Sequence, residues 1–295
     1  MKIFQWILIL TFFSFTFLTS CDSDDEPTID TATFNANFSG LEDLGSDFAY
    51  EGWLIVDGAP VSAGIFTVDA DGRPSATNFE VNADDLANAT TYVLTIEPSP
   101  DSDPAPSAVH ILAGDFSGNT AALTVDHGAA VATDFTGSTG TYILATPTDT
   151  DDTNEASGVW WLDPTAGPAA GLDLPELPEG WIYEGWAVID GTPVSTGTFR
   201  TPAGADGGAN YSGDQPGPPF PGEDFLQNAP AGLDFPTDLR GATVVISVEP
   251  VPDNSAAPFT LKPLVGPVSA DAPEHAPLTM NNNATATNPT GSVSK

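Results

Sequence analysis

One line of the sequence occurs twice, and this internal repeat constrains the fold more than any other feature of the chain. Residues 50–66 read YEGWLIVDGAPVSAGIF and residues 183–199 read YEGWAVIDGTPVSTGTF, which are identical at eleven of seventeen positions. A second pair follows in the same order, TYVLTIEPSPD at 91–101 and TVVISVEPVPD at 243–253. Because the parts keep their order, the sequence predicts an internal duplication.

Each repeated line is expected to form a β-hairpin. Apolar residues occupy both alternating sets of positions in YEGWLIV, so this strand should be covered on both faces. The Asp-Gly pairs at 57–58 and 190–191 are turn signals because glycine accepts a positive φ. The later strand should stop at Glu-Pro, since proline cannot donate a ladder hydrogen bond.

Short strands with Gly- and Pro-rich turns, and no sustained helical period, predict an all-β protein of two tandem antiparallel β-sandwich domains. Copy 1 should span residues 31–148 and be closed by the strand at 140–149. After a linker at 149–157, copy 2 should span residues 158–275 and open with the strand at 159–163. By composition, residues 276–295 should be a disordered tail. A single core shared by both copies stays open as an alternative.

The N-terminus has the pattern of an exported lipoprotein, with a signal peptide at 1–20 and an acidic tether at 21–30. Leu-Thr-Ser-Cys at 18–21 resembles a bacterial lipobox, which implies acylation of Cys21 and anchoring in a membrane. The acidic run after Cys21 resembles the export signal of Bacteroidetes surface lipoproteins, which implies the outer face of the outer membrane. A plain signal peptide and a merely solvated tether are the alternatives.

The charge of the chain excludes one class of partner. Forty-one acidic residues face six basic ones, for a formal net charge of -35. Nucleic acids are bound by Lys and Arg that neutralise phosphates, so we expect no nucleic-acid partner. The expected contacts are the membrane, through the lipid on Cys21, and an unknown protein or glycan.

The repeated carboxylates are the more interesting candidates for acid–base chemistry. Glu51 and Glu184 lie near the start of the repeated strand, while Glu97 and Glu249 close the later one. A pair of carboxylates could act as acid and base at a suitable separation. We expect instead that each accepts backbone N–H bonds at a strand end, as a buried charge must. No catalytic residue and no enzyme activity are therefore expected.

Metal and cofactor sites are not expected either. The three histidines and single cysteine lack the spacing of a metal site. Two oxygen-rich segments, residues 68–72 and 149–155, leave calcium open, although neither has the twelve-residue loop of an EF-hand.

Three tryptophans suggest a different function. Trp160, Trp161 and Trp181 cluster around the start of copy 2, and an exposed tryptophan on a β-sandwich can stack on a sugar ring. They are therefore candidate ligand-stacking residues of a carbohydrate-binding surface module. Burial of these side chains between the copies is the alternative.

The repeated positions resemble the extracytoplasmic C-terminal domain of anti-sigma-K factors, which has a Tyr-x-x-Trp strand, a Gly-x-Phe return strand and a later strand ending in Glu-Pro. In copy 1 the matching residues are Tyr50, Trp53, Gly64, Phe66, Glu97 and Pro98, and in copy 2 they are Tyr183, Trp186, Gly197, Phe199, Glu249 and Pro250. Together with Glu51, Asp57, Gly58, Glu184, Asp190 and Gly191, the repeated residues are expected to serve the fold.

The resemblance implies a fold but not the regulation. The family carries a cytoplasmic sigma-binding segment and a transmembrane helix before this domain, and neither is expected here. The sequence therefore predicts a non-enzymatic cell-envelope lipoprotein with a structural or interaction role. A carbohydrate-binding module of an outer-membrane uptake system is the alternative, and a hydrolase the third hypothesis.

Overall fold

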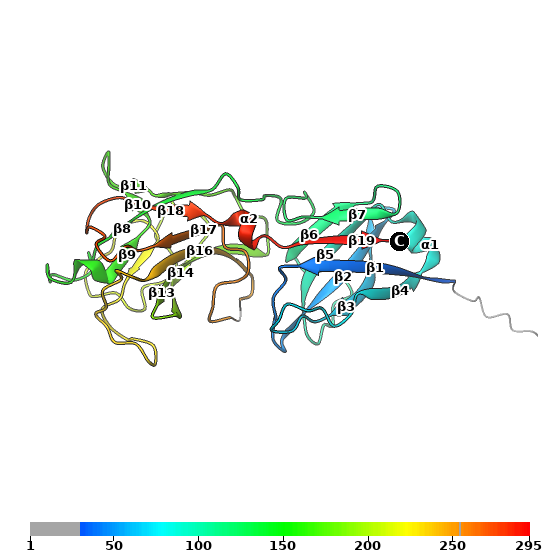
Figure 1. Cartoon of the computed structure of the whole chain (residues 1–295), viewed down its shortest axis with the longest axis horizontal. Helices are drawn as coiled ribbons and strands as arrows, with labels where there is room; N and C mark the ends of the chain where they lie inside the picture. Colours follow the sequence, from blue (N-terminus) through cyan, green and yellow to red (C-terminus); the bar gives the residue numbers. More distant parts are fainter. Residues whose placement is uncertain (1–29, 254) are drawn as a thin grey trace, which may run out of the picture.

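The computed structural model describes residues 30–253 and 255–295, which form a mostly antiparallel β structure. Two units lie end to end along the long axis of the molecule (Figure 1). The N-terminal unit consists of two four-stranded sheets, ordered β3-β2-β5-β6 and β4-β1-β19-β7. Its strands are β1 (Thr31–Ser39), β2 (Phe48–Val56), β3 (Ala59–Phe66), β4 (Asn78–Asn82), β5 (Thr91–Pro98), β6 (His110–Asp115), β7 (Thr120–Leu123) and β19 (Thr290–Ser294).

The C-terminal unit is a nearly closed barrel of eight strands. Their order is β14-β13-β16-β17-β18-β8-β9-β15, and the first and last strands of this path approach one another. The strands are β8 (Thr139–Leu144), β9 (Gly158–Trp160), β13 (Trp181–Ile189), β14 (Thr192–Phe199), β15 (Gly222–Asp224), β16 (Thr243–Pro250), β17 (Leu264–Pro267) and β18 (Leu278–Asn282).

Only short elements accompany these strands. Helix α1 (Ala83–Asn88) is capped by Asn82, whose side chain accepts from the N–H groups of Asp84 and Asp85. The remaining elements are β10 (Leu162–Asp163), β11 (Ala169–Ala170), β12 (Leu172–Asp173), the 3-10 turn η1 (Glu155–Ser157) and helix α2 (Ala284–Thr287).

The two units exchange their last strands. Strand β8 follows the N-terminal unit along the chain, yet it pairs with β18, β9 and β12 in the C-terminal unit. The final strand β19 crosses back and pairs with β1 and β7 of the N-terminal unit, as Figure 1 shows. In both units the exchanged strand lies beside the unit's first strand, β1 or β9.

This exchange corrects two predictions. The strand at 140–149 does not close copy 1, and residues 276–295 are not a disordered tail but form β18, α2 and β19. The tail is polar in composition, but β19 is paired on both sides and its Val293 is 1% exposed. The mostly antiparallel β class is confirmed, whereas two sandwiches that each fold from their own segment are not what the chain forms.

The repeated hairpins have the predicted turns. Asp57 and Gly58 have φ values of 52° and 80°, and the equivalent Asp190 and Gly191 have 50° and 83°. Positive φ at both positions is the mark of the tight turn that matches strand twist. Each hairpin also has a register shift, at Gly52/Trp53 and at Gly185/Trp186.

The recurring glycine of the return strand has a steric reason. Gly64 has a φ of 121°, and a Cβ at this position would lie 2.5 Å from Cδ1 of Phe79. Gly197 has a φ of 126°, and a Cβ there would lie 2.6 Å from the amide nitrogen of Gly208. Any side chain would therefore be strained and would collide with its neighbour.

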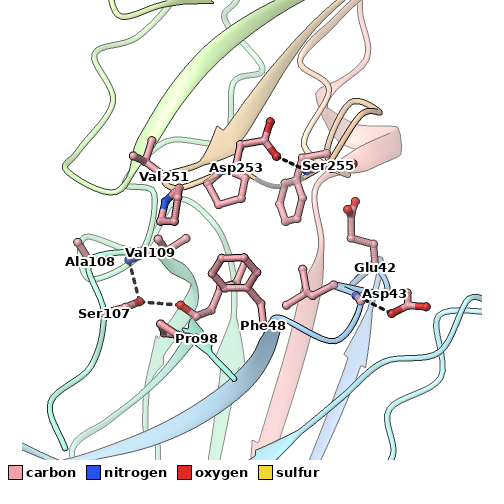
Figure 2. A pocket seen from close by; sticks show the side chains of 16 residues that line it. Glu42, Asp43, Phe48, Pro98, Ser107, Ala108, Val109, Val251, Asp253 and Ser255 are labelled. Atoms are coloured by element: carbon pink, nitrogen blue, oxygen red, sulfur yellow. Dashed lines mark hydrogen bonds between the residues drawn. The ribbon is translucent and has the colours of Figure 1, made fainter. Parts of the chain in front are cut away.

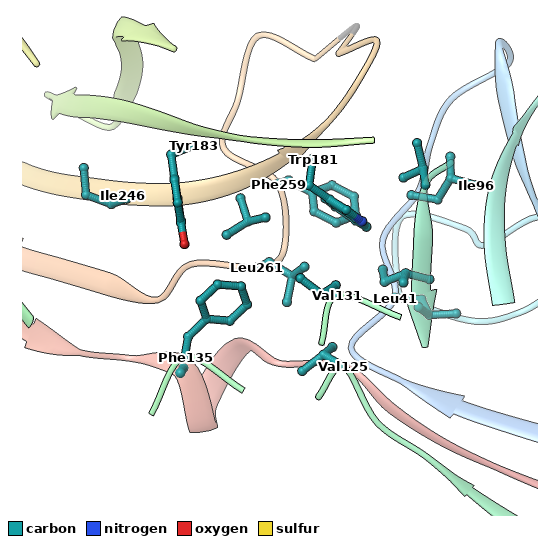
Figure 3. Packing of buried hydrophobic residues seen from close by; sticks show 14 of the residues in the cluster. Leu41, Ile96, Val125, Val131, Phe135, Trp181, Tyr183, Ile246, Phe259 and Leu261 are labelled. Carbon is teal, nitrogen blue, oxygen red and sulfur yellow. The ribbon is translucent and has the colours of Figure 1, made fainter. Parts of the chain in front are cut away.

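A single hydrophobic cluster runs through both units. Figure 3 shows Trp181 and Phe259 of the C-terminal unit beside Leu41 and Ile96 of the N-terminal unit. The segment between β7 and β8 adds buried residues where it crosses, among them Phe135, which is 1% exposed. The alternative of a shared core therefore describes this molecule.

Candidate functional site

The repeated tryptophans and carboxylates form the same hydrogen-bond chain in both units. In the N-terminal unit, Nε1 of Trp53 donates to Oγ1 of Thr95 at 2.8 Å, and the Thr95 hydroxyl donates to Glu97. In the C-terminal unit, Nε1 of Trp186 donates to Oγ of Ser247 at 2.8 Å, and that hydroxyl donates to Glu249. The repeat therefore preserves a buried polar network beside the strand pair.

Glu97 and Glu249 accept backbone N–H groups from the chain beyond their own strands. The Ser107 N–H reaches both carboxylate oxygens of Glu97, at 2.9 and 3.1 Å. The Phe259 N–H reaches only Oε1 of Glu249, at 2.9 Å, and Oε2 of Glu249 has no partner. Both side chains are buried, so these bonds fix the connection that follows each Glu-Pro strand.

Glu51 and Glu184 are buried beside them but have different partners. They accept the hydroxyls of Ser62 and Ser195 across the hairpin rather than backbone N–H groups. Burial raises the pKa of both carboxyls above the usual range, and the serine hydroxyls oppose this effect. In this arrangement the serine hydroxyls are donors to carboxylates within a sheet.

Tyr50 and Tyr183 hold the segment that leads into the repeated strand. The Tyr50 hydroxyl donates to the carbonyl oxygen of Glu42 at 3.0 Å, and the Tyr183 hydroxyl donates to that of Pro175 at 2.7 Å. Each tyrosine ring also stacks on the phenylalanine of its return strand, Phe66 or Phe199. These repeated aromatics therefore serve the core.

None of the three candidate stacking tryptophans is available at the surface. Trp160 is 4% exposed, while Trp161 and Trp181 are fully buried. Nε1 of Trp160 donates to Oδ1 of buried Asp224 at 2.7 Å, and Nε1 of Trp181 donates to the His110 carbonyl at 3.2 Å. The prediction of a sugar-stacking surface is wrong, because Trp160 packs against residues 217–222, while Trp161 and Trp181 belong to the cluster that runs through both units.

The two oxygen-rich segments are occupied by their own contacts. Oδ1 of Asp69 accepts the N–H groups of Asp71 and Arg73, and the Arg73 guanidinium pairs with Asp71 at 2.5 Å. In the other segment, Oδ2 of Asp149 accepts from the Asn154 amide at 2.7 Å. Neither segment turns an unpartnered buried oxygen inward.

A cavity of about 290 Å³ lies where the two units meet. Phe48, Pro98 and Val109 line it from the N-terminal unit, and Val251, Asp253 and Phe259 line it from the C-terminal unit (Figure 2). The loops after both Glu-Pro strands thus supply opposite walls. The cavity is largely apolar, with carboxylates at its edge.

The charge at this cavity is negative. Glu42 and Asp43 stand on one side and Asp253 on the other (Figure 2). Burial raises the pKa of Glu42 to about 7, while the nearby charge of Lys262 opposes the shift. A positive group in the cavity would favour the ionised form of Glu42, so the site is suited to an apolar ligand that carries a cation.

The sequence did not indicate this cavity. Phe48 stands two residues before the repeated line of residues 50–66, and Val251 stands between two prolines, and neither belongs to a motif. The available signal was that a loop after a Glu-Pro strand recurs in both copies. The lining residues come together only when the two units dock, and a local sequence pattern does not predict that docking.

Comparison with known proteins agrees with part of this picture. Residues 30–109 match the family described as anti-sigma-K factor rskA, C-terminal. The matched segment runs from the residue before β1 to the residue before β6 and contains the first copy of the repeated hairpin. The N-terminal unit therefore contains an anti-sigma-K factor C-terminal-like domain. No curated protein and no solved structure matches the chain.

The membrane anchor falls outside what the structure describes. Cys21 and the preceding signal lie in residues 1–29. Among the described residues, every helix is too short or too polar to span a bilayer.

Proposed function

We propose that this chain is a non-enzymatic, lipid-anchored binding protein of the cell envelope, and that its ligand site is the cavity between the two units. The observation that carries the proposal is the junction itself. Residues from both units line one apolar cavity, and the exchanged strands and continuous core hold its two walls in place. A preorganised cavity loses less free energy on binding than one that must form.

The ligand we propose is a segment of a protein partner that presents an apolar side chain next to a basic one. The apolar side chain would lie against Phe48 and Val251, which the cavity leaves partly accessible. The basic group would face Glu42, Asp43 or Asp253. The net charge of -35 would also attract a basic partner over a longer range and speed association.

The cellular setting rests on the N-terminal sequence. Acylation of Cys21 would hold the binding units at a membrane on the tether of residues 21–30, at the cell surface if the acidic run acts as an export signal. Replacement of Cys21 by alanine should release the protein from the membrane. Continued labelling of that variant with radioactive palmitate would contradict the anchor.

A peptide array tests the binding proposal. It would carry short peptides in which one apolar residue is flanked by lysine in one set and by glutamate in the other. We expect retention of the lysine-flanked set, and loss of retention in Val251→Lys, which places a positive charge in the cavity wall. Ile65→Lys is the matched control, since Ile65 is 58% exposed and Val251 is 43% exposed.

Two outcomes would overturn the proposal. The first is no retention of any peptide by the wild-type protein. The second is equal retention by Val251→Lys and Ile65→Lys, because binding would then follow the general acidity of the surface.

The two other hypotheses have less support. The carbohydrate-binding hypothesis depended on Trp160, Trp161 and Trp181, and these side chains are buried. The hydrolase hypothesis depended on paired carboxylates, and in both units each of these accepts a serine or threonine hydroxyl within the sheet.

A further inference from the structure

Three carboxylates converge at the end of β16 in the C-terminal unit. Glu184 on β13 faces Ser247 in the register of the strand pair, so Glu249, two residues further along β16, is its diagonal neighbour on the same face. Asp253 follows in the loop after Pro250. One oxygen of each of these three carboxylates lies within 4.8 Å of the other two.

Two of these groups have an oxygen with no partner. Oε1 of Glu184 accepts the Ser195 hydroxyl, and Oε1 of Glu249 accepts from Ser247 and from the Phe259 N–H. Oε2 of Glu184 and Oε2 of Glu249 are buried without any hydrogen-bond donor. The side chains are 6% and 0% exposed. Buried carboxylate oxygens are normally satisfied, so the two orphan oxygens point to a missing positive partner.

No side chain of the described residues supplies that charge. Lysine, arginine and histidine side chains there all stay farther than 4.0 Å from the three carboxylates. Lys262 lies near enough for its charge to be felt by Glu249, but it forms no ion pair with it, and its own pKa is lowered by burial. The neighbouring charges of Glu184 and Asp253 instead repel the charge on Glu249.

We propose that Glu184, Glu249 and Asp253 bind a hard divalent cation, calcium or magnesium. All the ligand atoms are carboxylate oxygens, which these cations prefer, and neither histidine nor cysteine belongs to the group. Asp253 is exposed, so the site is open to water on one side, and water would complete the coordination.

The N-terminal unit contains the equivalent group of carboxylates, but without buried oxygens that lack a partner. Glu51, Glu97 and Asp101 hold the equivalent sequence positions. Here both oxygens of Glu97 accept the Ser107 N–H, and neither Glu51 nor Glu97 has a buried oxygen without a partner. The duplication thus provides an internal control, and we assign the cation to the C-terminal unit.

Binding would have a structural consequence for the cavity. Asp253 is a cavity-lining residue in a loop that begins at Pro250, and its Oδ1 also accepts the Ser255 N–H at 2.8 Å. A cation would tie this loop to β13 and β16. The inference does not rest on the proposed peptide binding, because its probe is the metal alone.

The test uses the full chain, freed of metal with a chelator and then titrated with calcium, magnesium or terbium at a fixed pH. We expect one saturable site per chain. Terbium luminescence should be excited through Trp186, which is linked to Glu249 through Ser247. Asp253→Asn should weaken binding at least about tenfold, and Glu184→Gln should abolish the luminescence.

Asp101→Asn is the matched control and should bind like the wild type. Equal binding by Asp253→Asn and Asp101→Asn would overturn the inference, because the metal would then be held by the acidic surface at large. Absence of any saturable binding by the wild type would overturn it as well. Circular dichroism of each variant separates a lost site from a lost fold.

Discussion

At the scale of single residues, the buried carboxylates decide how this protein responds to pH. Burial raises the pKa of Glu249 to about 8, and burial likewise raises the pKa of Glu42 and of Asp206 to about 7. In the unfolded chain these groups lose their protons near their ordinary values. Between those limits the folded protein binds more protons than the unfolded one, so its stability falls as pH rises.

We predict that the metal-free protein loses stability between about pH 5 and about pH 8, by up to about 1.4 kcal/mol per pH unit for each such group. Glu249→Gln should reduce this slope and should be more stable than the wild type at about pH 8, because its amide oxygen keeps the bond from Phe259 without a buried charge. Urea unfolding at about pH 5 and at about pH 8 measures the free energy of unfolding of both proteins. An unchanged slope would contradict the prediction.

The equivalent change in the N-terminal unit should act in the opposite direction. Both oxygens of Glu97 are occupied as acceptors, by Thr95 and Ser107. In Glu97→Gln the amide oxygen can still accept from both groups, but the amide NH2 takes the place of the other oxygen and faces the Ser107 N–H, donor against donor. We therefore expect a loss of about 1 kcal/mol at both pH values.

At the scale of elements, the exchanged strands hold the two units together. β19 lies between β1 and β7, so without it two strands of one sheet would expose unpaired edges. β19 is also short and polar apart from Val293. The buried side chain of Val293 and the hydrogen bonds to β1 and β7 therefore hold β19 in this sheet.

Val293→Asp should destabilise the protein by about 3 kcal/mol, because it places an unpaired charge in the core beside β1 and β7. Ser294→Asp, at the exposed neighbouring position, should change stability by less than about 0.5 kcal/mol. Hydrogen exchange locates the effect, since the amides of β1 should lose protection in the first variant. Equal protection of β1 in both variants would show that β19 does not hold the sheet.

At the scale of the whole molecule, the units should not behave as independent domains. One hydrophobic cluster contains residues of both units. The N-terminal unit is completed by β19 from the end of the chain, and the C-terminal barrel is completed by β8, which precedes it in the chain. Contacts also cross the junction directly, such as the Thr260 hydroxyl to the Gly40 carbonyl at 2.9 Å. Unfolding of one unit would therefore expose apolar surface and sheet edges of the other.

We predict a single cooperative transition on heating the chain, with equal calorimetric and van't Hoff enthalpies. A fragment of residues 30–148 should fail to fold stably, because it lacks β19 and carries β8 without its partners. Adding a peptide of residues 283–295 to a fragment of residues 30–138 should restore structure. Two separate transitions in the full chain, or a stable fragment 30–148, would contradict this account.

Local patterns in the sequence were sufficient for the hairpins and for the β class. Alternating apolar residues, the Asp-Gly turns at 57–58 and 190–191, and the Glu-Pro strand ends depend on neighbouring residues and on backbone sterics. The same patterns singled out Glu51, Glu97, Glu184 and Glu249 as repeated positions. They could not tell which of these carboxylates would keep a free oxygen, because that depends on the loops that pack against them.

The tertiary structure alone decided the strand exchange, the junction cavity and the fate of the tryptophans. β8 and β19 pair with strands far from them in the chain, so their places depend on how the two units are connected and docked. Trp160 and Trp181 look like surface candidates in sequence, but residues 217–222 cover the first and the N-terminal unit covers the second. Which side chains are buried, and which residues line a common cavity, depends on contacts between segments that are distant in the chain. A local sequence pattern does not determine those contacts.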